Sequence, residues 1–115
     1  MVQVNRRRFV EATAVAASVL CGAQTSRASE VAAPPQVALG KTGITMSRVG
    51  QGTGVRGGRR QSDQTRMGFE KLVSLFHHAY DRGITFFDLA DLYGSHRDFR
   101  EALRTIPRDK CTSLT

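Results

Sequence analysis

The sequence predicts an α/β fold in which β-strands alternate with single amphipathic helices. Two observations lead to this prediction. Residues 37–46 have apolar ends around a centre containing Gly and Thr, which is typical of a β-hairpin. Residues 48–115 then alternate between strand-like runs and helix-like apolar periods. Strands joined by single helices form right-handed βαβ units, so the strands after the hairpin should build a parallel sheet.

The hairpin should consist of strands at residues 37–39 and 44–46, joined by the turn Gly-Lys-Thr-Gly at 40–43. A short strand at residues 48–51 follows and ends at Gly52. The chain then enters a loop that is rich in glycine and arginine and has almost no apolar residue.

A helix is expected to begin near Thr65, because Ser62 or Asp63 can cap its first turn. Gly83 should end it, since glycine commonly follows the last helical residue. Apolar residues at steps of three and four predict one buried face. They are Phe69, Leu72, Val73, Phe76 and Tyr80.

A second strand is predicted at residues 84–87, where both faces are apolar, as in a parallel sheet that is covered on each side. A second helix should run over residues 98–105 and stop before Pro107. A third strand is expected to begin at Cys111, whose side chain we expect to pack in the interior.

The N-terminal residues 1–33 have the features of an export signal. Arg6-Arg7-Arg8-Phe9 precedes an alanine-rich run at residues 12–20, which is shorter than the roughly 20 apolar residues of a membrane span. The order Asn-Arg-Arg-x-Phe-Val-Glu resembles a twin-arginine signal, whose expected partner is the twin-arginine export machinery. An amphipathic leader helix or a disordered start remains the alternative.

This interpretation predicts a bacterial protein exported to the periplasm or beyond the cytoplasm, with no stable membrane span. Pro34-Pro35 marks the start of the folded domain, residues 34–115.

The formal net charge of +7 raises the question of an anionic partner. Part of it belongs to the predicted signal, and part to four arginines in the glycine-rich loop. These are Arg56, Arg59, Arg60 and Arg66. No aromatic residue is interleaved with them, so we predict no nucleic-acid binding. A phosphate-bearing small molecule and a solvated loop both remain open. The two cysteines, Cys21 and Cys111, do not have metal-site spacing.

Residues 52–57 match the pattern G-x-G-x-x-G, which raises the alternative of a dinucleotide-binding fold. That fold requires a helix to start within the motif and an acidic residue about 20 positions later. Here a polar loop intervenes, and Asp88 lies 36 positions after Gly52. An eight-stranded barrel fits better, because its catalytic residues lie at the carboxyl ends of strands and in the loops that follow. Asp88 ends the second strand, and Tyr93 lies in the loop after it.

Four segments resemble the N-terminal part of the aldo/keto reductases. They are LGKTGITMSRVGQGTG, AYDRGITFFDLADLYGS, EAL and IPRDK. The resemblance implies an incomplete (β/α)8 TIM barrel, with an N-terminal hairpin and about two and a half βα units. It further implies an NADPH-dependent oxidoreductase that acts on a small carbonyl substrate.

The resemblance assigns catalytic roles to Asp88 and Tyr93, and cofactor-binding roles to Thr53, Gly54 and Asp88. It assigns no metal site. Three positions depart from the family pattern. Leu89 replaces a common Thr, Gly54 replaces an aromatic residue found in many members, and His96 replaces a frequent acidic residue.

Tyrosine is a weak acid at neutral pH, so a carbonyl reductase of this family uses a lysine to lower the phenol pKa and an aspartate to hold the lysine. None of Lys41, Lys71 and Lys110 matches that lysine, and no histidine matches the family's histidine. We therefore expect an N-terminal fragment of an exported reductase that is inactive alone. The alternative is a non-catalytic interaction module built from the same βα units.

Overall fold

The computed structural model describes residues 31–115, so most of the predicted export signal at 1–33 lies outside the described residues. Residues Ala32–Thr115 form a compact unit. In this described part, no helix is both long enough and apolar enough to cross a membrane.

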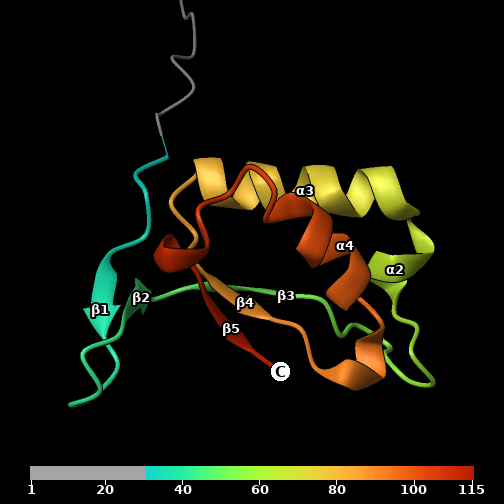
Figure 1. Ribbon diagram of the computed structural model, residues 1–115, viewed down its shortest axis with the longest axis horizontal. Helices are drawn as coiled ribbons and strands as arrows, with labels where there is room; N and C mark the ends of the chain where they lie inside the picture. The colour runs from blue at the N-terminus through green and yellow to red at the C-terminus, as the bar shows by residue number, and fades with distance from the viewer. Residues whose placement is uncertain (1–30) are drawn as a thin grey trace, which may run out of the picture. The chain divides into compact units, whose positions relative to one another are not determined.

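The predicted hairpin is confirmed, with β1 at Gln36–Ala38 and β2 at Thr45–Ser47 paired antiparallel. It lies at the amino-terminal edge of the main sheet (Figure 1). There the Thr85 backbone N–H donates to Ser47 Oγ at 2.9 Å, and the Ser47 N–H donates to Thr85 Oγ1 at 2.8 Å. This reciprocal pair fastens the hairpin to Thr85, the residue before strand β4 at Phe86–Asp88.

The main sheet contains three parallel strands in the order β3-β4-β5, at Gly50–Gly52, Phe86–Asp88 and Thr112–Leu114. This confirms the predicted parallel βαβ arrangement. The sheet is open among the described residues, as expected for a partial fold. Gly50 pairs with Phe86, and a Cβ at Gly50 would lie 3.1 Å from Cε1 of that ring. The Phe86 side chain thus covers its glycine neighbour.

The first long helix differs from the prediction. A short helix, α2 at Asp63–Arg66, begins at the predicted cap, Ser62, whose hydroxyl accepts a hydrogen bond from the Thr65 N–H. The chain then breaks at Gly68, which has a φ of 95°, and α3 runs over Phe69–Asp81. Glycine tolerates this left-handed backbone. The prediction of one continuous helix was therefore wrong at Gly68.

The second predicted helix is present as α4, but it covers His96–Ala102, so it begins two residues earlier and ends three residues earlier than expected. Two short 3₁₀ segments complete the fold. They are η1 at Asp91–Tyr93, between β4 and α4, and η2 at Arg108–Lys110, before β5.

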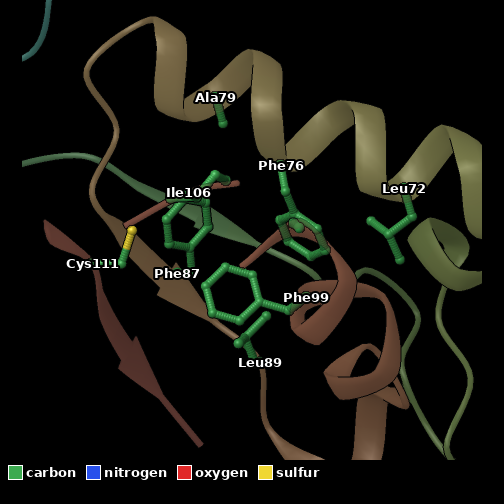
Figure 2. Packing of buried hydrophobic residues seen from close by; sticks show 9 residues of the cluster. Leu72, Phe76, Ala79, Phe87, Leu89, Phe99, Ile106 and Cys111 are labelled. Atoms are coloured by element: carbon green, nitrogen blue, oxygen red, sulfur yellow. The ribbon is translucent and has the colours of Figure 1, made fainter. Parts of the chain in front are cut away.

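Helices α3 and α4 cover one face of the sheet (Figure 1), and three aromatic rings join them to it (Figure 2). The ring centroid of Phe87 lies 5.8 Å from that of Phe76 and 4.9 Å from that of Phe99. Aromatic pairs at such distances stabilise a core beyond the burial of their area. The prediction that Phe69 belongs to the core was wrong. Its side chain is 38% exposed, and its ring lies under the Arg97 guanidinium.

Cys111 packs at the edge of this core, as predicted from the sequence. Burial raises the pKa of its thiol, because a thiolate would lose solvation there. The side chain therefore acts as a small apolar residue.

The core can be tested with two leucines. Leu72 is fully buried, whereas Leu92 is 55% exposed. We predict that Leu72→Ala lowers the free energy of unfolding by about 2–5 kcal/mol, because it leaves a cavity. The matched change Leu92→Ala should alter it by no more than about 0.5 kcal/mol. Urea unfolding followed by far-UV circular dichroism measures both, and equal effects would contradict the described packing.

Candidate active site at the carboxyl ends of the strands

The predicted site residues lie at one edge of the sheet. Gly52 and Asp88 are partners in register at the carboxyl ends of β3 and β4, so Thr53 lies directly beside Asp88. Tyr93 ends η1 in the loop after β4. The structure therefore brings together two strand ends and the loop that carries the phenol.

Asp88 uses its backbone and its side chain differently. Its carbonyl oxygen accepts hydrogen bonds from the Thr53 N–H at 3.2 Å and from Thr53 Oγ1 at 2.8 Å. Its half-buried carboxylate forms no hydrogen bond or ion pair with any residue in the described range 31–115. Because Phe87 faces the helices, strand alternation directs the Asp88 side chain to the opposite face of the sheet.

Thr53 and Ser95 form a buried hydrogen bond of 2.8 Å, and both side chains are fully inaccessible to solvent. The Thr53 hydroxyl has one proton, which it donates to the carbonyl of Asp88, so Ser95 donates to Thr53. This chain of bonds joins the end of β3 to the end of β4 and to the start of α4. Ser95 ends the family-like segment AYDRGITFFDLADLYGS, but its role was missed because nothing in the sequence indicates its contact with Thr53.

The ring of Tyr93 lies against two glycines of the loop after β3. A Cβ at Gly54 would lie 2.6 Å from Cε2 of Tyr93, and a Cβ at Gly57 would lie 2.6 Å from Cδ1. Real side chains essentially never approach so closely, so neither position has room for a side chain while the ring stays in place. An aromatic residue at position 54, as in many aldo/keto reductases, could not coexist with this ring position.

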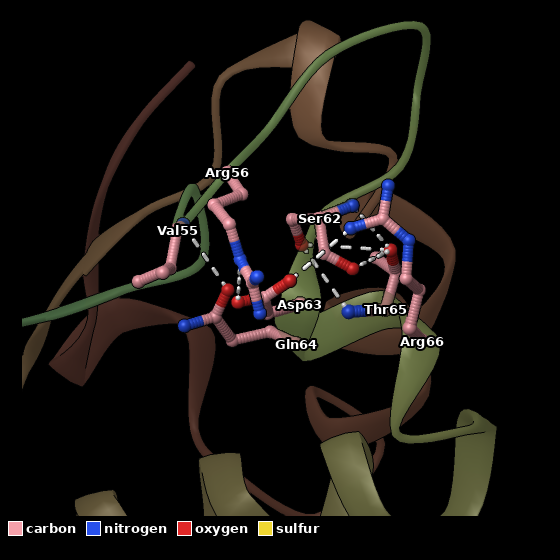
Figure 3. Close-up of polar contacts among 7 residues, drawn as sticks. All are labelled: Val55, Arg56, Ser62, Asp63, Gln64, Thr65 and Arg66. Carbon is pink, nitrogen blue, oxygen red and sulfur yellow. Dashed lines mark hydrogen bonds and ion pairs between the residues drawn. The ribbon is translucent and has the colours of Figure 1, made fainter.

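The glycine- and arginine-rich loop is fastened to α2 by polar contacts (Figure 3). Asp63 bridges two arginines, with Arg56 Nε at 2.8 Å and Arg66 Nη1 at 3.2 Å. The Val55 N–H also donates to Gln64 Oε1 at 3.2 Å. Because Arg56 and Arg66 share the carboxylate of Asp63, their charges are partly neutralised, and they are less available to bind an anion.

A second contact joins this loop to the segment carrying Tyr93. Arg60 Nη2 lies 3.1 Å from a carboxylate oxygen of Asp91, in η1, and His96 Nδ1 lies 3.8 Å from the other oxygen. His96, the first residue of α4, thus contacts Asp91 in η1. These groups are exposed, so the ion pair between Arg60 and Asp91 contributes little stability by itself.

The lysines lie where the sequence suggested. Lys41 is in the hairpin turn, Lys71 is exposed in the first turn of α3, and Lys110 belongs to η2. Since η2 precedes β5, Lys110 lies at the opposite edge of the sheet from Asp88. None of the three forms a hydrogen bond or ion pair with Asp88 or Tyr93.

The residues predicted to bind the cofactor make contacts within the protein. The hydroxyl and N–H of Thr53 already have partners inside the protein, and the Tyr93 ring lies on Gly54. A hollow of about 940 Å³ lies away from these residues, near the hairpin and the start of β5, and its lining includes Ile44 and Cys111. No group of side chains suited to a metal occurs within residues 31–115. The roles predicted for Asp88, Tyr93, Thr53 and Gly54 remain predictions.

Comparison with known proteins points to a class of oxidoreductase. The chain shows a distant and partial resemblance to the N-terminal region of an aldo-keto reductase. The relative is "Probable aldo-keto reductase 1" of Glycine max, which is 36% identical over 83 residues. The match covers 69% of this chain but 23% of the relative, so the chain spans about a quarter of the relative's length. No family model and no solved structure matches the sequence.

The buried hydrogen bond between Thr53 and Ser95 can be tested with a double-mutant cycle. We predict that Thr53→Val lowers the free energy of unfolding by about 1–3 kcal/mol, because it leaves the Ser95 hydroxyl buried without its acceptor. Ser95→Ala in the same chain should recover part of that loss. Thr45→Val, on the exposed hairpin strand, is the matched control. Strictly additive effects in urea unfolding would contradict a direct interaction.

Proposed function

We propose that this chain is the N-terminal part of an exported, aldo/keto reductase-like, NADPH-dependent carbonyl oxidoreductase, and that residues 1–115 alone are inactive. The observation that carries the proposal is the edge of the sheet around Asp88. The carboxylate there has no partner among the described residues, and Tyr93 is held in the adjoining loop. The distant match to an aldo-keto reductase supports the same class.

Two side chains would perform the chemistry that belongs to this chain. Reduction of a carbonyl leaves negative charge on the substrate oxygen, which a nearby acid must neutralise. Tyr93 would hold that proton on its hydroxyl. Asp88 would hold an ammonium group beside the phenol, because a carboxylate without a partner is a ready counter-ion for a lysine.

The proposed inactivity follows from the positions of the lysines rather than from the site residues. A phenol without a neighbouring cation is a poor proton donor at neutral pH. None of Lys41, Lys71 and Lys110 forms a hydrogen bond or ion pair with Tyr93 or Asp88. A non-catalytic interaction module remains the second candidate, because β3 and β5 each leave one edge unpaired among the described residues.

A chimera tests the proposed roles. Residues 34–115 would replace the matching N-terminal region of the Glycine max relative, whose remaining three quarters would supply the rest of the fold. We predict NADPH-dependent reduction of a simple aldehyde by the chimera and none by the 115-residue chain. Tyr93→Phe should lower the chimera's kcat by about 10²–10⁴-fold, the usual contribution of a general acid. Tyr80→Phe, on α3, is the matched control.

Two results would contradict this proposal. The first is NADPH consumption by the purified 115-residue chain. The second is a soluble chimera in which Tyr93→Phe and Tyr80→Phe have the same activity. A compact 115-residue chain that captures a protein partner without NADPH would favour the interaction module instead.

The proposed export depends on Arg6 and Arg7. We predict that residues 1–33, fused to a fluorescent reporter, direct it to the periplasm of a bacterium with an intact twin-arginine pathway. Replacing both Arg6 and Arg7 by Lys should retain the reporter in the cytoplasm, whereas the control Arg8→Lys should not. Cell fractionation measures the distribution, and export that survives the double change would exclude this pathway.

A further inference from the structure

We infer that Gly54 and Gly57 are positioning residues that form a seat for the ring of Tyr93. The placement of the ring stands on the geometry alone. Its importance for catalysis rests on the proposed function, in which the Tyr93 hydroxyl donates a proton.

The two glycines meet different ends of the same ring. Gly54 faces the hydroxyl-bearing end, since a Cβ there would lie 2.6 Å from Cε2 and 2.8 Å from Cε1. Gly57 faces one side of the ring, with corresponding distances of 2.6 Å to Cδ1 and 3.1 Å to Cε1. Contact along this length restricts both the tilt and the depth of the phenol.

The seat itself is held by backbone bonds. The Gly57 N–H donates to the carbonyl of Gly54 at 2.8 Å, which closes a tight turn beneath the ring. The Asp63 N–H donates to the Val55 carbonyl at 2.9 Å, and this bond ties the turn to α2. Arg56, between the two glycines, has a φ of 48°, a left-handed conformation that costs energy in a residue with a side chain. The two backbone hydrogen bonds hold the turn in this conformation.

The segment carrying Tyr93 is held from its other side by backbone contact. Gly94 has a φ of 74°, and a Cβ there would lie 2.7 Å from the carbonyl carbon of Arg60. The next residue, Ser95, is bonded to Thr53. The segment carrying Tyr93 therefore contacts the glycine- and arginine-rich loop at two places. The ring of Tyr93 lies on Gly54 and Gly57, and the next residue, Gly94, lies against Arg60.

This arrangement gives position 54 a specific requirement. A side chain at position 54 should displace the hydroxyl-bearing end of the ring, because backbone hydrogen bonds hold the turn on the other side of the contact. Misplacement of a catalytic group by about 1 Å can cost roughly 100-fold in rate. Glycine at position 54 is thus the residue that permits this placement of the proton donor.

The tyrosine content of the chain makes the ring directly observable. The sequence has two tyrosines and no tryptophan, so Tyr80→Phe leaves Tyr93 as the single tyrosine, which can be excited selectively over phenylalanine. In the full 115-residue chain with this change, we expect a near-UV circular dichroism band from Tyr93. Its fluorescence should be quenched by acrylamide less efficiently than that of N-acetyltyrosinamide.

Gly54→Ala should then abolish the near-UV band and raise quenching towards that of the free tyrosine derivative, with the far-UV spectrum retained. Gly57→Ala should act in the same direction, but its Cβ would also lie 2.9 Å from the carbonyl oxygen of Gly54, so Gly54→Ala is the variant that tests the ring contact. Gly52→Ala and Gly58→Ala are matched controls, since an added Cβ at either position meets no atom within 4 Å. Both controls should leave the Tyr93 signals unchanged.

The inference is overturned if Tyr93 is quenched like the free derivative before any glycine is changed. It is also overturned if Gly54→Ala leaves the signals unaltered, or if the control variants alter them equally. In the chimera described above, Gly54→Ala should lower kcat by about 10- to 100-fold with little change in KM. If Gly54→Ala changes the Tyr93 signal in the 115-residue chain but the chimera never reduces aldehydes, the seat is retained and the proposed function is rejected.

Discussion

The carbonyl oxygen of Asp88 is the point on which the arrangement of the site depends. It accepts two hydrogen bonds from Thr53, and Thr53 in turn accepts one from Ser95. The end of β3 is thereby held to the end of β4 and to the residue before α4, without using the Asp88 carboxylate. All the side-chain groups in this chain of bonds are buried, where an unmade hydrogen bond is costly. The backbone at the strand end can thus be rigid while the acidic side chain stays free for another partner.

The sequence was sufficient to predict the elements that hydrophobic spacing determines. The parallel strands, the apolar face of α3 and the packing of Cys111 all follow from residues whose burial is periodic. The break at Gly68 was not predictable in the same way, because Gly68 lies between the predicted cap at Ser62 and the apolar repeat that begins at Phe69, where one continuous helix could also run. Local periodicity does not report a left-handed residue between two helices. The prediction that Phe69 is buried was wrong for the same reason. Phe69 follows the break directly, and its ring lies against Arg97.

The site was predictable only in part. Asp88, Thr53 and Tyr93 could be placed near one another, because the carboxyl ends of parallel strands meet at one edge. The roles of Ser95 and Gly57 could not be predicted, since they come from contacts across 42 and 36 positions of the chain. Gly54 was recognised as a departure from the aldo/keto reductase pattern. Its physical reason, the ring of Tyr93, became visible only in three dimensions.

The pairing of Gly50 with Phe86 has a consequence for how this sheet can change during evolution. The two residues share one volume, in which a small neighbour permits a large ring. Enlarging the first residue alone would force the ring to rotate, whereas shrinking the second alone would open a void. Drift at these two sites should therefore be correlated, with the sum of their side-chain volumes kept nearly constant. Such compensation would be recorded across homologous sequences as a covarying pair on neighbouring strands.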